Sequence, residues 1–313
     1  MASTVVRVAA AVIVRADGAV LLAQRPPGKV YEGYWEFPGG KLERGETPRQ
    51  ALDRELEEEL GLEVRRACAW LVRRYAYAHA DVELHFFRVF AFDGKPVGRD
   101  GQAFAWQHPG HFTVSPLLPA NAPIIEALQL PPIYAVSAAS EMGESIFLER
   151  LRHAMDAGLR LVVMREKSWS LERQRALTDR VLSIARSYGA RVLLNGSDGH
   201  ARQWGCDGVH WTSAMLANAS LRPEDLLCAA SCHDAAEVQR AGELSLDFVV
   251  LGPVLKTLSH PVATPLGWKA FASAIEHTSV PVFALGGLTG NDLTTAIDHG
   301  AHGVALRSAV WRP

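Results

Sequence analysis

Three glutamates near residue 55 have the residue type and the spacing of a metal site. Glu55, Glu58 and Glu59 lie three and four positions apart, so a helix would place them on one face. Glu57 would fall about 160° from Glu55 around that helix, in solvent. Like charges on one face repel each other unless cations occupy the site. Hard divalent cations choose carboxylate oxygens and leave room for water and phosphate. The spacing therefore predicts a site for Mg²⁺, with Mn²⁺ as an alternative ion.

The helix that must position these glutamates is marked at both ends. Thr47 suits the N-cap, Pro48 suits the first helical position, and Gln50 completes a capping box. Gly61 suits a left-handed end. The apolar residues between these ends recur at helical spacing and should be buried: Ala51, Leu52, Leu56 and Leu60. A solvated acidic helix, with Arg54 only as an ion-pair partner, is the alternative interpretation.

Residues 40–62 match one longer pattern at every fixed position, G-x5-E-x7-R-E-U-x-E-E-x-G-U, where U is a bulky aliphatic residue. This stretch resembles the Nudix box, the signature of hydrolases that cleave a nucleoside diphosphate linked to another group. The resemblance implies that the backbone near Gly40 and the three glutamates hold the metal. It also implies that Arg54 orients the glutamates, with Glu55 as the first choice of general base.

The similarity narrows to the 8-oxo-dGTP diphosphatase (MutT) branch over about residues 5–130, through WEFPGGKLERGETP and LLPANAPIIEALQL. In that branch the asparagine of P-A-N reads the oxidised guanine, and Asn121 matches it. An amide can both donate and accept on one purine edge, although a helix N-cap is an alternative role for this residue type. Arg25 and Phe37 match nucleotide-contacting positions, with a core role as the alternative for Phe37. Asp100 matches a further metal or base position, with a turn aspartate as the alternative.

This branch would hydrolyse 8-oxo-dGTP to 8-oxo-dGMP and pyrophosphate, which sanitises the nucleotide pool and prevents mutation. A Nudix enzyme for another nucleotide is the alternative, because the box specifies the chemistry and not the base. The surrounding pattern predicts a hairpin of strands over 5–14 and 19–24, strands over 70–77 and 82–92, and a short helix within 116–128. Strands around two helices predict an α/β/α sandwich with a mixed sheet for residues 1–130.

The sequence pattern changes after the linker at Pro131 and Pro132. Short apolar runs alternate with amphipathic helical stretches. There are eight such runs, at 133–136, 159–164, 191–194, 207–210, 227–231, 247–251, 281–285 and 303–306. Eight strands separated by helices predict a (β/α)8 TIM barrel over residues 133–313, with functional residues just after the strands.

Residues at the expected strand ends resemble the thiamine-phosphate synthase and thiazole tautomerase family over most of 133–310. The resemblance implies a ligand site that contains Arg165, Lys167, Asn195, Ser231, His233, Gly286 and Gly287. The two glycines would bind a phosphate through backbone N–H groups, whereas an ordinary Gly-Gly turn is the alternative.

Several positions depart from the synthase pattern. Gly196 and Met215 stand where the family's two metal aspartates are expected, and the loop at 257–260 lacks the family's lysine. Neither residue can hold a hard cation, so the synthase reaction is not expected. The tautomerase instead uses a histidine matched by His233, after Ser231, and histidine suits proton transfer near neutral pH. A metabolite sensor that regulates the Nudix half is another alternative. A retained fold that binds a ligand or stabilises the chain is the favoured interpretation.

The composition of the chain limits which other classes of protein it could belong to. The 313 residues are 48% hydrophobic with a net charge of −2, which suits two globular domains and no general attraction to nucleic acid or anionic membrane. There is no apolar run long enough for a membrane span, and the first residues read as a strand and not as a signal peptide. The four cysteines form no CxxC pair. We therefore expect a cytoplasmic protein whose partners are a small nucleotide and a phosphate-bearing ligand of the barrel.

Overall fold

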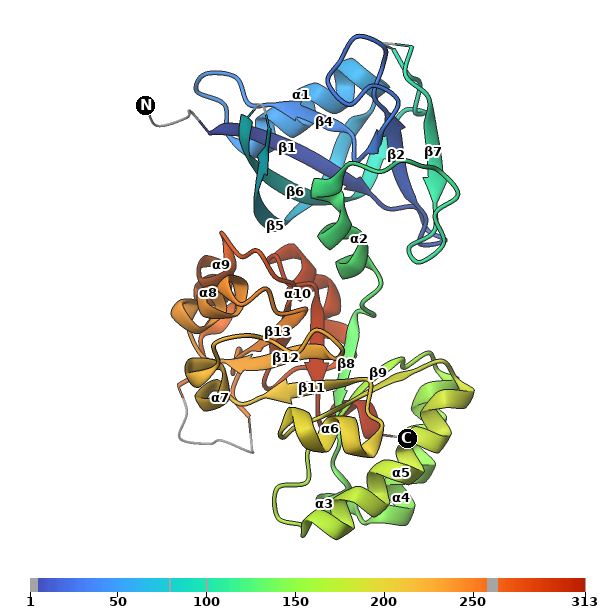
Figure 1. The fold of residues 1–313 in the computed structure, drawn as a ribbon, viewed down its shortest axis with the longest axis vertical. Helices are drawn as coiled ribbons and strands as arrows, with labels where there is room; N and C mark the ends of the chain where they lie inside the picture. The colour runs from blue at the N-terminus through green and yellow to red at the C-terminus, as the bar shows by residue number, and fades with distance from the viewer. Residues whose placement is uncertain (1–4, 79, 100, 258–263, 313) are drawn as a thin grey trace. The chain divides into compact units, whose positions relative to one another are not determined.

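The computed structural model describes residues 5–78, 80–99, 101–257 and 264–312 (Figure 1). The chain divides into two compact units, Met1–Gln129 and Leu130–Pro313. Each unit has its own hydrophobic clusters. The two units are described separately below.

The first unit contains two sheets. The larger has the strand order β4-β1-β6-β5, with β1 and β6 parallel and the other pairs antiparallel. Its strands are β1 (Val6–Ile13), β4 (Gly39–Lys41), β5 (Glu63–Tyr77) and β6 (Ala80–Asp93). The smaller, antiparallel sheet has the order β3-β2-β7 and contains β2 (Val20–Gln24), β3 (Trp35–Glu36) and β7 (Phe104–Gln107). The mixed sheet expected for this half is confirmed.

Alternate residues of β1 face opposite layers of the first unit. Ala9, Ala11 and Ile13 pack in one cluster with the apolar face of α1 (Pro48–Leu60). Ala10 and Val12 pack in another cluster with α2 (Ala122–Leu128), which follows the short 3-10 helix η1 (Pro119–Asn121). Because successive side chains of a strand point to opposite faces, the sheet lies between the two helices, as in an α/β/α sandwich.

Two expectations for the strands of this unit need correction. β1 and β2 do not form an extended hairpin, because they belong to different sheets. Pairing between them is limited to the turn, with an isolated bridge between Val14 and Val20 and a backbone hydrogen bond from Arg15 to Ala19. The strand expected over 70–77 begins earlier, at Glu63. β5 is an edge strand, and its first residues include charged side chains. A search for apolar runs misses such a segment because an edge strand is partly solvated.

The second unit is a closed barrel of eight parallel strands in the order β10-β11-β12-β13-β14-β15-β8-β9. The strands are β8 (Ile133–Val136), β9 (Leu161–Met164), β10 (Arg191–Leu194), β11 (Gly208–Trp211), β12 (Leu227–Cys232), β13 (Phe248–Leu251), β14 (Val282–Leu285) and β15 (Gly303–Leu306). The barrel prediction is confirmed, with strand limits shifted by at most two residues.

Helices connect the barrel strands (Figure 1). They are α3 (Ala139–Met142), α4 (Glu144–Asp156), α5 (Leu171–Ser187), α6 (Asp198–Trp204), α7 (Ser213–Asn218), α8 (Ala235–Glu243), α9 (Gly267–Ile275) and α10 (Leu293–Asp298), with short 3-10 helices η2 (Gly290–Asp292) and η3 (Ala309–Trp311). Inside the barrel, Tyr134, Phe248 and Phe283 are fully buried and in ring contact. None of the helices in the described ranges combines the length and the apolar character that crossing a bilayer requires.

Candidate functional site

Local signals fix α1, the helix that carries the glutamates. The Thr47 side chain accepts a hydrogen bond from the backbone N–H of Gln50, and the Gln50 side chain accepts one from the backbone N–H of Thr47 at 2.9 Å. Gly61 ends the helix with φ of 67°, in the left-handed region. The four apolar positions of the expected stripe are buried. The buried face therefore turns the glutamate face away from the core.

Arg54 is the centre of an ion-pair network on this face. Its Nε and Nη2 donate to the two carboxylate oxygens of Glu46 at 2.8 and 3.0 Å. Its Nη1 donates to Glu55 at 3.0 Å and to Glu58 at 3.2 Å. The hydrogen bonds that Arg54 donates to Glu46 hold the pKa of Glu46 at about 2 and raise the pKa of Arg54. Arg54 is thus placed to orient Glu55 and Glu58, as the Nudix resemblance implies.

Gly40 lies directly against the Glu55 carboxyl group. A Cβ atom added at Gly40 would sit 2.1 Å from the Glu55 Cδ and Oε1 atoms. Real Cβ atoms do not approach other heavy atoms so closely, so a larger residue at this position would displace the Glu55 carboxylate from its place beside the β4 backbone. A backbone group of β4 and the Glu55 side chain therefore share one small region, as expected for a joint metal shell.

The donors of this region suit a hard cation, since they are carboxylate and peptide oxygens. The described residues nevertheless contain no group of three or more His, Cys, Asp or Glu side chains already gathered around one point. Glu55 and Glu58 converge on Arg54 instead. The three-glutamate metal site stays a prediction. Asp100, the further expected ligand, lies outside the described residues.

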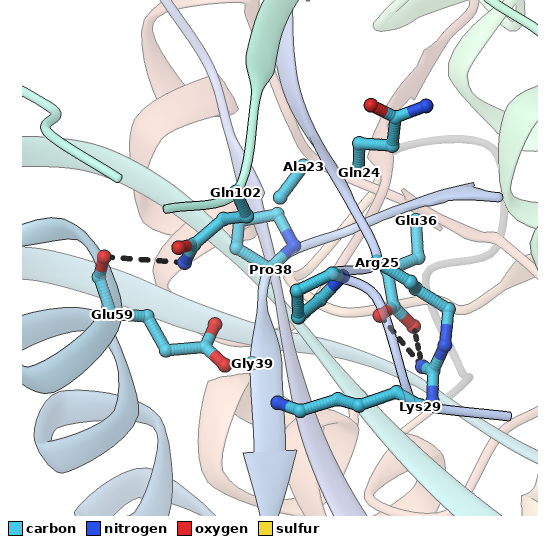
Figure 2. A pocket seen from close by; sticks show the side chains of 10 residues that line it. Ala23, Gln24, Arg25, Lys29, Glu36, Pro38, Gly39, Glu59 and Gln102 are labelled. Carbon is cyan, nitrogen blue, oxygen red and sulfur yellow. Dashed lines mark hydrogen bonds and ion pairs between the residues drawn. The ribbon is translucent and has the colours of Figure 1, made fainter. Parts of the chain in front are cut away.

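Glu59 lines a small pocket, open to solvent, together with Gly39 and the start of the loop after β2 (Figure 2). Arg25 and Lys29 of that loop also line it, as does Glu36 of β3. Basic and acidic side chains therefore border one open space beside the glutamate helix. Such a space could admit an anion next to the expected metal site.

The side chain of Arg25, an expected substrate contact, donates its hydrogen bonds to other residues of the protein. Its Nη1 lies 2.7 Å from both carboxylate oxygens of Glu36, and its Nε donates to the Val30 carbonyl at 2.7 Å. Desolvation by burial raises the pKa of Glu36, and the charge of Arg25 opposes that shift. A nucleotide contact by Arg25 stays a prediction.

Asn121 is buried, with 4% of its surface exposed. It occupies the N-cap position of α2, yet its side chain makes no capping hydrogen bond. Its Nδ2 is also buried and has no hydrogen-bond partner in the described chain. The helix-cap interpretation therefore does not hold. A buried amide with an open donor needs a partner, and base recognition stays a prediction for this residue.

Phe37 is a residue of the hydrophobic core, which was the alternative to a substrate contact for this residue. Only 3% of its surface is exposed, and its ring packs edge-to-face on Phe86 with 6.1 Å between centroids. The substrate contact expected for Phe37 stays a prediction.

In the barrel, the polar residues at the strand ends bond largely to one another. The Tyr134 hydroxyl lies 2.9 Å from His210 Nδ1, and His210 Nε2 lies 2.8 Å from Ser231 Oγ. The Asn195 side chain donates to the His210 carbonyl at 2.9 Å. Burial lowers the pKa of His210 to about 3, so this imidazole is neutral near pH 7. Sequence reasoning left His210 out of the ligand site, although its position at a strand end was a usable signal.

Ser231 and His233, both expected in the ligand site, make different contacts, and a shared ligand site for them stays a prediction. Ser231 bonds to His210, whereas His233 Nδ1 lies 3.1 Å from Glu237 Oε2. The reason is that β12 ends at Cys232. His233 therefore lies in the loop after the strand, and its side chain contacts Glu237 in the first turn of α8.

Arg165 and Lys167 follow β9, as expected, and Arg307 follows β15. Burial and then the charge of Arg307 lower the pKa of Arg165, and the charge of Arg165 lowers the pKa of Lys167. Arg307 was not included in the expected ligand site, although it directly follows the last strand. Its Nη2 lies 2.7 Å from Glu141 Oε1. The three cations therefore influence one another at this end of the barrel.

Gly286 and Gly287 have φ of 106° and 69°. A Cβ at Gly286 would meet Pro253 at 2.6 Å, and one at Gly287 would meet the Lys256 carbonyl at 2.4 Å. Backbone conformation and close packing explain both glycines. A phosphate site there stays a prediction.

Comparisons with known proteins give both halves a family. Residues 9–127 match the model of the NUDIX domain, and residues 133–310 match that of thiamine monophosphate synthase. The chain is 41% identical over 128 residues to the CTP pyrophosphohydrolase of Escherichia coli, covering 39% of this chain and 90% of that protein. It is 37% identical over 128 residues to the 8-oxo-dGTP diphosphatase of Haemophilus influenzae, covering 41% of this chain and 94% of that protein.

The second half is 31% identical over 180 residues to the putative thiamine-phosphate synthase 2 of Aquifex aeolicus, covering 57% of this chain and 96% of that protein. Both resemblances seen in the sequence are thus confirmed. The chain belongs to two families: its first unit is a Nudix pyrophosphohydrolase, and its second unit is a member of the thiamine monophosphate synthase family.

Proposed function

We propose that the first unit hydrolyses 8-oxo-dGTP to 8-oxo-dGMP and pyrophosphate, with Mg²⁺, and so removes an oxidised precursor from the nucleotide pool. The observation that carries recognition of a base is the buried Nδ2 of Asn121, which has no hydrogen-bond partner in the described chain. The choice of the oxidised base comes from the resemblance to the MutT branch. The likeness to the 8-oxo-dGTP diphosphatase of Haemophilus influenzae supports it.

The chemistry of the base explains why an amide would discriminate. N7 of 8-oxoguanine carries a hydrogen, whereas N7 of guanine carries an acceptor lone pair. The Asn121 Oδ1 would accept from that N7–H, and Nδ2 would donate to O6, which both bases share. With dGTP, Oδ1 would face a lone pair and lose its hydrogen bond. Polar sites discriminate strongly because the wrong ligand leaves a buried group unpaired.

Glu55, Glu58 and Glu59, with the Gly40 backbone, would hold the cation. When bound, Mg²⁺ supplies charge neutralisation for the triphosphate and lowers the barrier to attack at phosphorus. Arg54 would keep Glu55 and Glu58 in place through the hydrogen bonds described above. Glu55, which lies against Gly40, would take the proton from the attacking water. The water oxygen would form the new bond to phosphorus as the bridging P–O bond breaks.

A CTP pyrophosphohydrolase is the rival function for this unit. The observation that favours it is the 41% identity to the Escherichia coli enzyme of that name. In this alternative, Asn121 would meet a pyrimidine edge, and a preference for oxidised guanine would not be expected.

For the barrel we propose ligand binding or stabilisation of the chain, without thiamine-phosphate synthesis. Met215, at one of the two expected aspartate positions, packs against the barrel's hydrophobic cluster. A thioether there fills space and is a poor ligand for a hard cation. The rival is a barrel with thiazole tautomerase-like activity, which product formation from a thiazole phosphate would support.

The experiment is a substrate screen of the purified full chain with Mg²⁺, covering 8-oxo-dGTP, dGTP, CTP and dCTP. We expect the highest kcat/KM with 8-oxo-dGTP and the release of pyrophosphate. A higher kcat/KM with CTP would favour the rival, and the absence of pyrophosphate among the products would contradict the reaction itself.

A further inference from the structure

We propose that Lys29 binds the phosphate chain of the nucleotide directly and that Arg25 acts as a positioning residue for the loop that carries it. This inference rests on the proposed function only in requiring a nucleoside triphosphate as substrate. It is independent of the base.

Several hydrogen bonds hold the loop after β2 in place. The backbone N–H of Arg25 donates to the Tyr34 carbonyl at 2.8 Å, and that of Gly33 donates to the Arg25 carbonyl at 3.0 Å. The Gln24 side chain closes the same end with a bond to the Gly33 carbonyl at 2.9 Å. Lys29 lies between these closed ends, after a turn at Gly28 with φ of 82°. The loop therefore presents Lys29 from a defined position.

Arg25 contributes to this loop more than to the pocket. Its Nε donates to the Val30 carbonyl, next to Lys29 in the chain, and its Nη1 contacts both oxygens of Glu36. The charge of Arg25 is thus compensated by a half-buried carboxylate. An arginine bound in this way has little net charge left for an incoming anion.

Lys29 differs from Arg25 in this respect. It lines the pocket beside Glu59 and Gly39, and its side chain extends along the pocket from the loop side (Figure 2). Within the described ranges, its ammonium group has neither an ion pair nor a hydrogen bond, although Glu36 is near enough to sense its charge. Lys29 is exposed, so this charge is available to a ligand.

The acidic side of the pocket explains why a cation is needed there. The nucleotide must bring a highly charged triphosphate next to Glu59 and the other glutamates of α1, and like charges repel. A lysine on the opposite side of the pocket offsets part of that repulsion through charge-assisted hydrogen bonds to phosphate oxygens. Such a contact forms in the ground state and persists in the transition state, so it should lower KM more than it changes kcat.

The test compares Lys29→Met with Lys29→Arg in the full-length protein. We expect Lys29→Met to raise KM for the preferred nucleotide about tenfold, the scale of one hydrogen bond to a charged group, with kcat within about twofold. Lys29→Arg should restore most of the affinity. Lys95→Met, at an exposed position after β6 that does not line the pocket, is the matched control and should leave KM unchanged.

Inorganic triphosphate, used as a competitive inhibitor, separates this inference from the choice of base. Its Ki should rise by the same factor as KM in Lys29→Met, because it has no base. A preference for CTP with a Lys29 effect on KM and Ki would refute the oxidised-guanine proposal and support the Lys29 contact. Unchanged KM and Ki in folded Lys29→Met would overturn the inference.

The positioning role of Arg25 has its own readout. Arg25→Lys should raise KM by loosening the loop, but the double variant Arg25→Lys/Lys29→Met should be no worse than Lys29→Met alone, because Arg25 acts through Lys29. If the two substitutions raise KM by fully additive amounts in free energy, Arg25 binds the substrate itself, and its assignment as a positioning residue is overturned.

Discussion

Two buried polar residues, one in each unit, differ in their hydrogen bonds. In the barrel, both ring nitrogens of His210 have partners, Tyr134 and Ser231. In the first unit, Asn121 is equally buried, yet its Nδ2 has none in the described chain. An unmade hydrogen bond on a buried group is costly. A paired group supports the fold, whereas an open one is available to a ligand.

The charged residues show the same contrast. Glu59 and Lys29 border one pocket of the first unit, whereas the barrel's Glu166 accepts hydrogen bonds from Ser137 Oγ at 2.6 Å and from the backbone N–H groups of Ala139 and Ser140 at 2.9 and 2.8 Å. Family-like residues at the right sequence positions are therefore not equivalent. Their surroundings distinguish residues that border a pocket from residues that hold the chain together.

The largest expected effect is on the glutamate face. Glu58→Gln should keep the fold and lower kcat by about 10³-fold or more, because stabilisation of charge by a bound metal supplies several kcal/mol. Steady-state kinetics with Mg²⁺ measures this loss. Glu57→Gln is the matched control, since Glu57 is a solvent-exposed neighbour that belongs to none of the ion pairs of Arg54. Near-normal turnover in folded Glu58→Gln would remove Glu58 from the metal site.

A smaller effect is expected at Asn121. Asn121→Ala should lower kcat/KM for 8-oxo-dGTP by about 10- to 100-fold relative to dGTP, on the scale of one or two lost polar contacts. The melting temperature should change little, because the side chain makes no capping bond whose loss would destabilise α2. Both kcat/KM values and the melting temperature are measured together. An unchanged substrate ratio would separate Asn121 from base choice.

The smallest effect concerns the barrel and pH. An unfolded histidine protonates near its ordinary pKa of about 6.5, whereas burial keeps His210 neutral down to about pH 3. Between these values the unfolded state binds more protons, so the free energy of unfolding should fall as the pH drops from about 6.5 toward 3. One such group contributes up to about 1.4 kcal/mol per pH unit.

Denaturant unfolding at several pH values measures this slope. His210→Gln should reduce this slope by the amount that corresponds to about one proton, because glutamine does not titrate. His153→Gln, at an exposed position of α4, controls for the general loss of a histidine. An identical slope in His210→Gln and the unaltered protein would mean that His210 does not stay neutral in the fold.

Local signals allowed much of the fold to be predicted from the sequence. The limits of α1 follow from Thr47, Pro48 and Gly61, which act within one turn of the helix. Each barrel strand was visible as a short apolar run between helices. The separation of β1 and β2 into two sheets was not visible, because the Asp17-Gly18 turn says nothing about which strands pair beyond it.

Site contacts between distant residues could not be predicted in the same way. Ser231 and His210 lie on neighbouring strands, 21 residues apart in the chain, so their bond depends on barrel register. The local S-x-H spacing favoured His233 instead. Likewise, the sequence shows that Arg25 is basic but cannot show that it forms an ion pair with Glu36. Motif spacing locates such residues, and tertiary contacts decide what they bind.

The most direct test of the contrast between the units is nucleotide hydrolysis by residues 1–130 alone, compared with the full chain. The helix with the glutamates, the pocket and Asn121 all lie within this stretch. Circular dichroism would first establish that the fragment is folded, and kcat/KM for 8-oxo-dGTP with Mg²⁺ would then be measured for both proteins. Our account predicts values within about twofold of each other, well under the 1.4 kcal/mol that corresponds to a tenfold change. A folded fragment without activity, beside an active full chain, would contradict it.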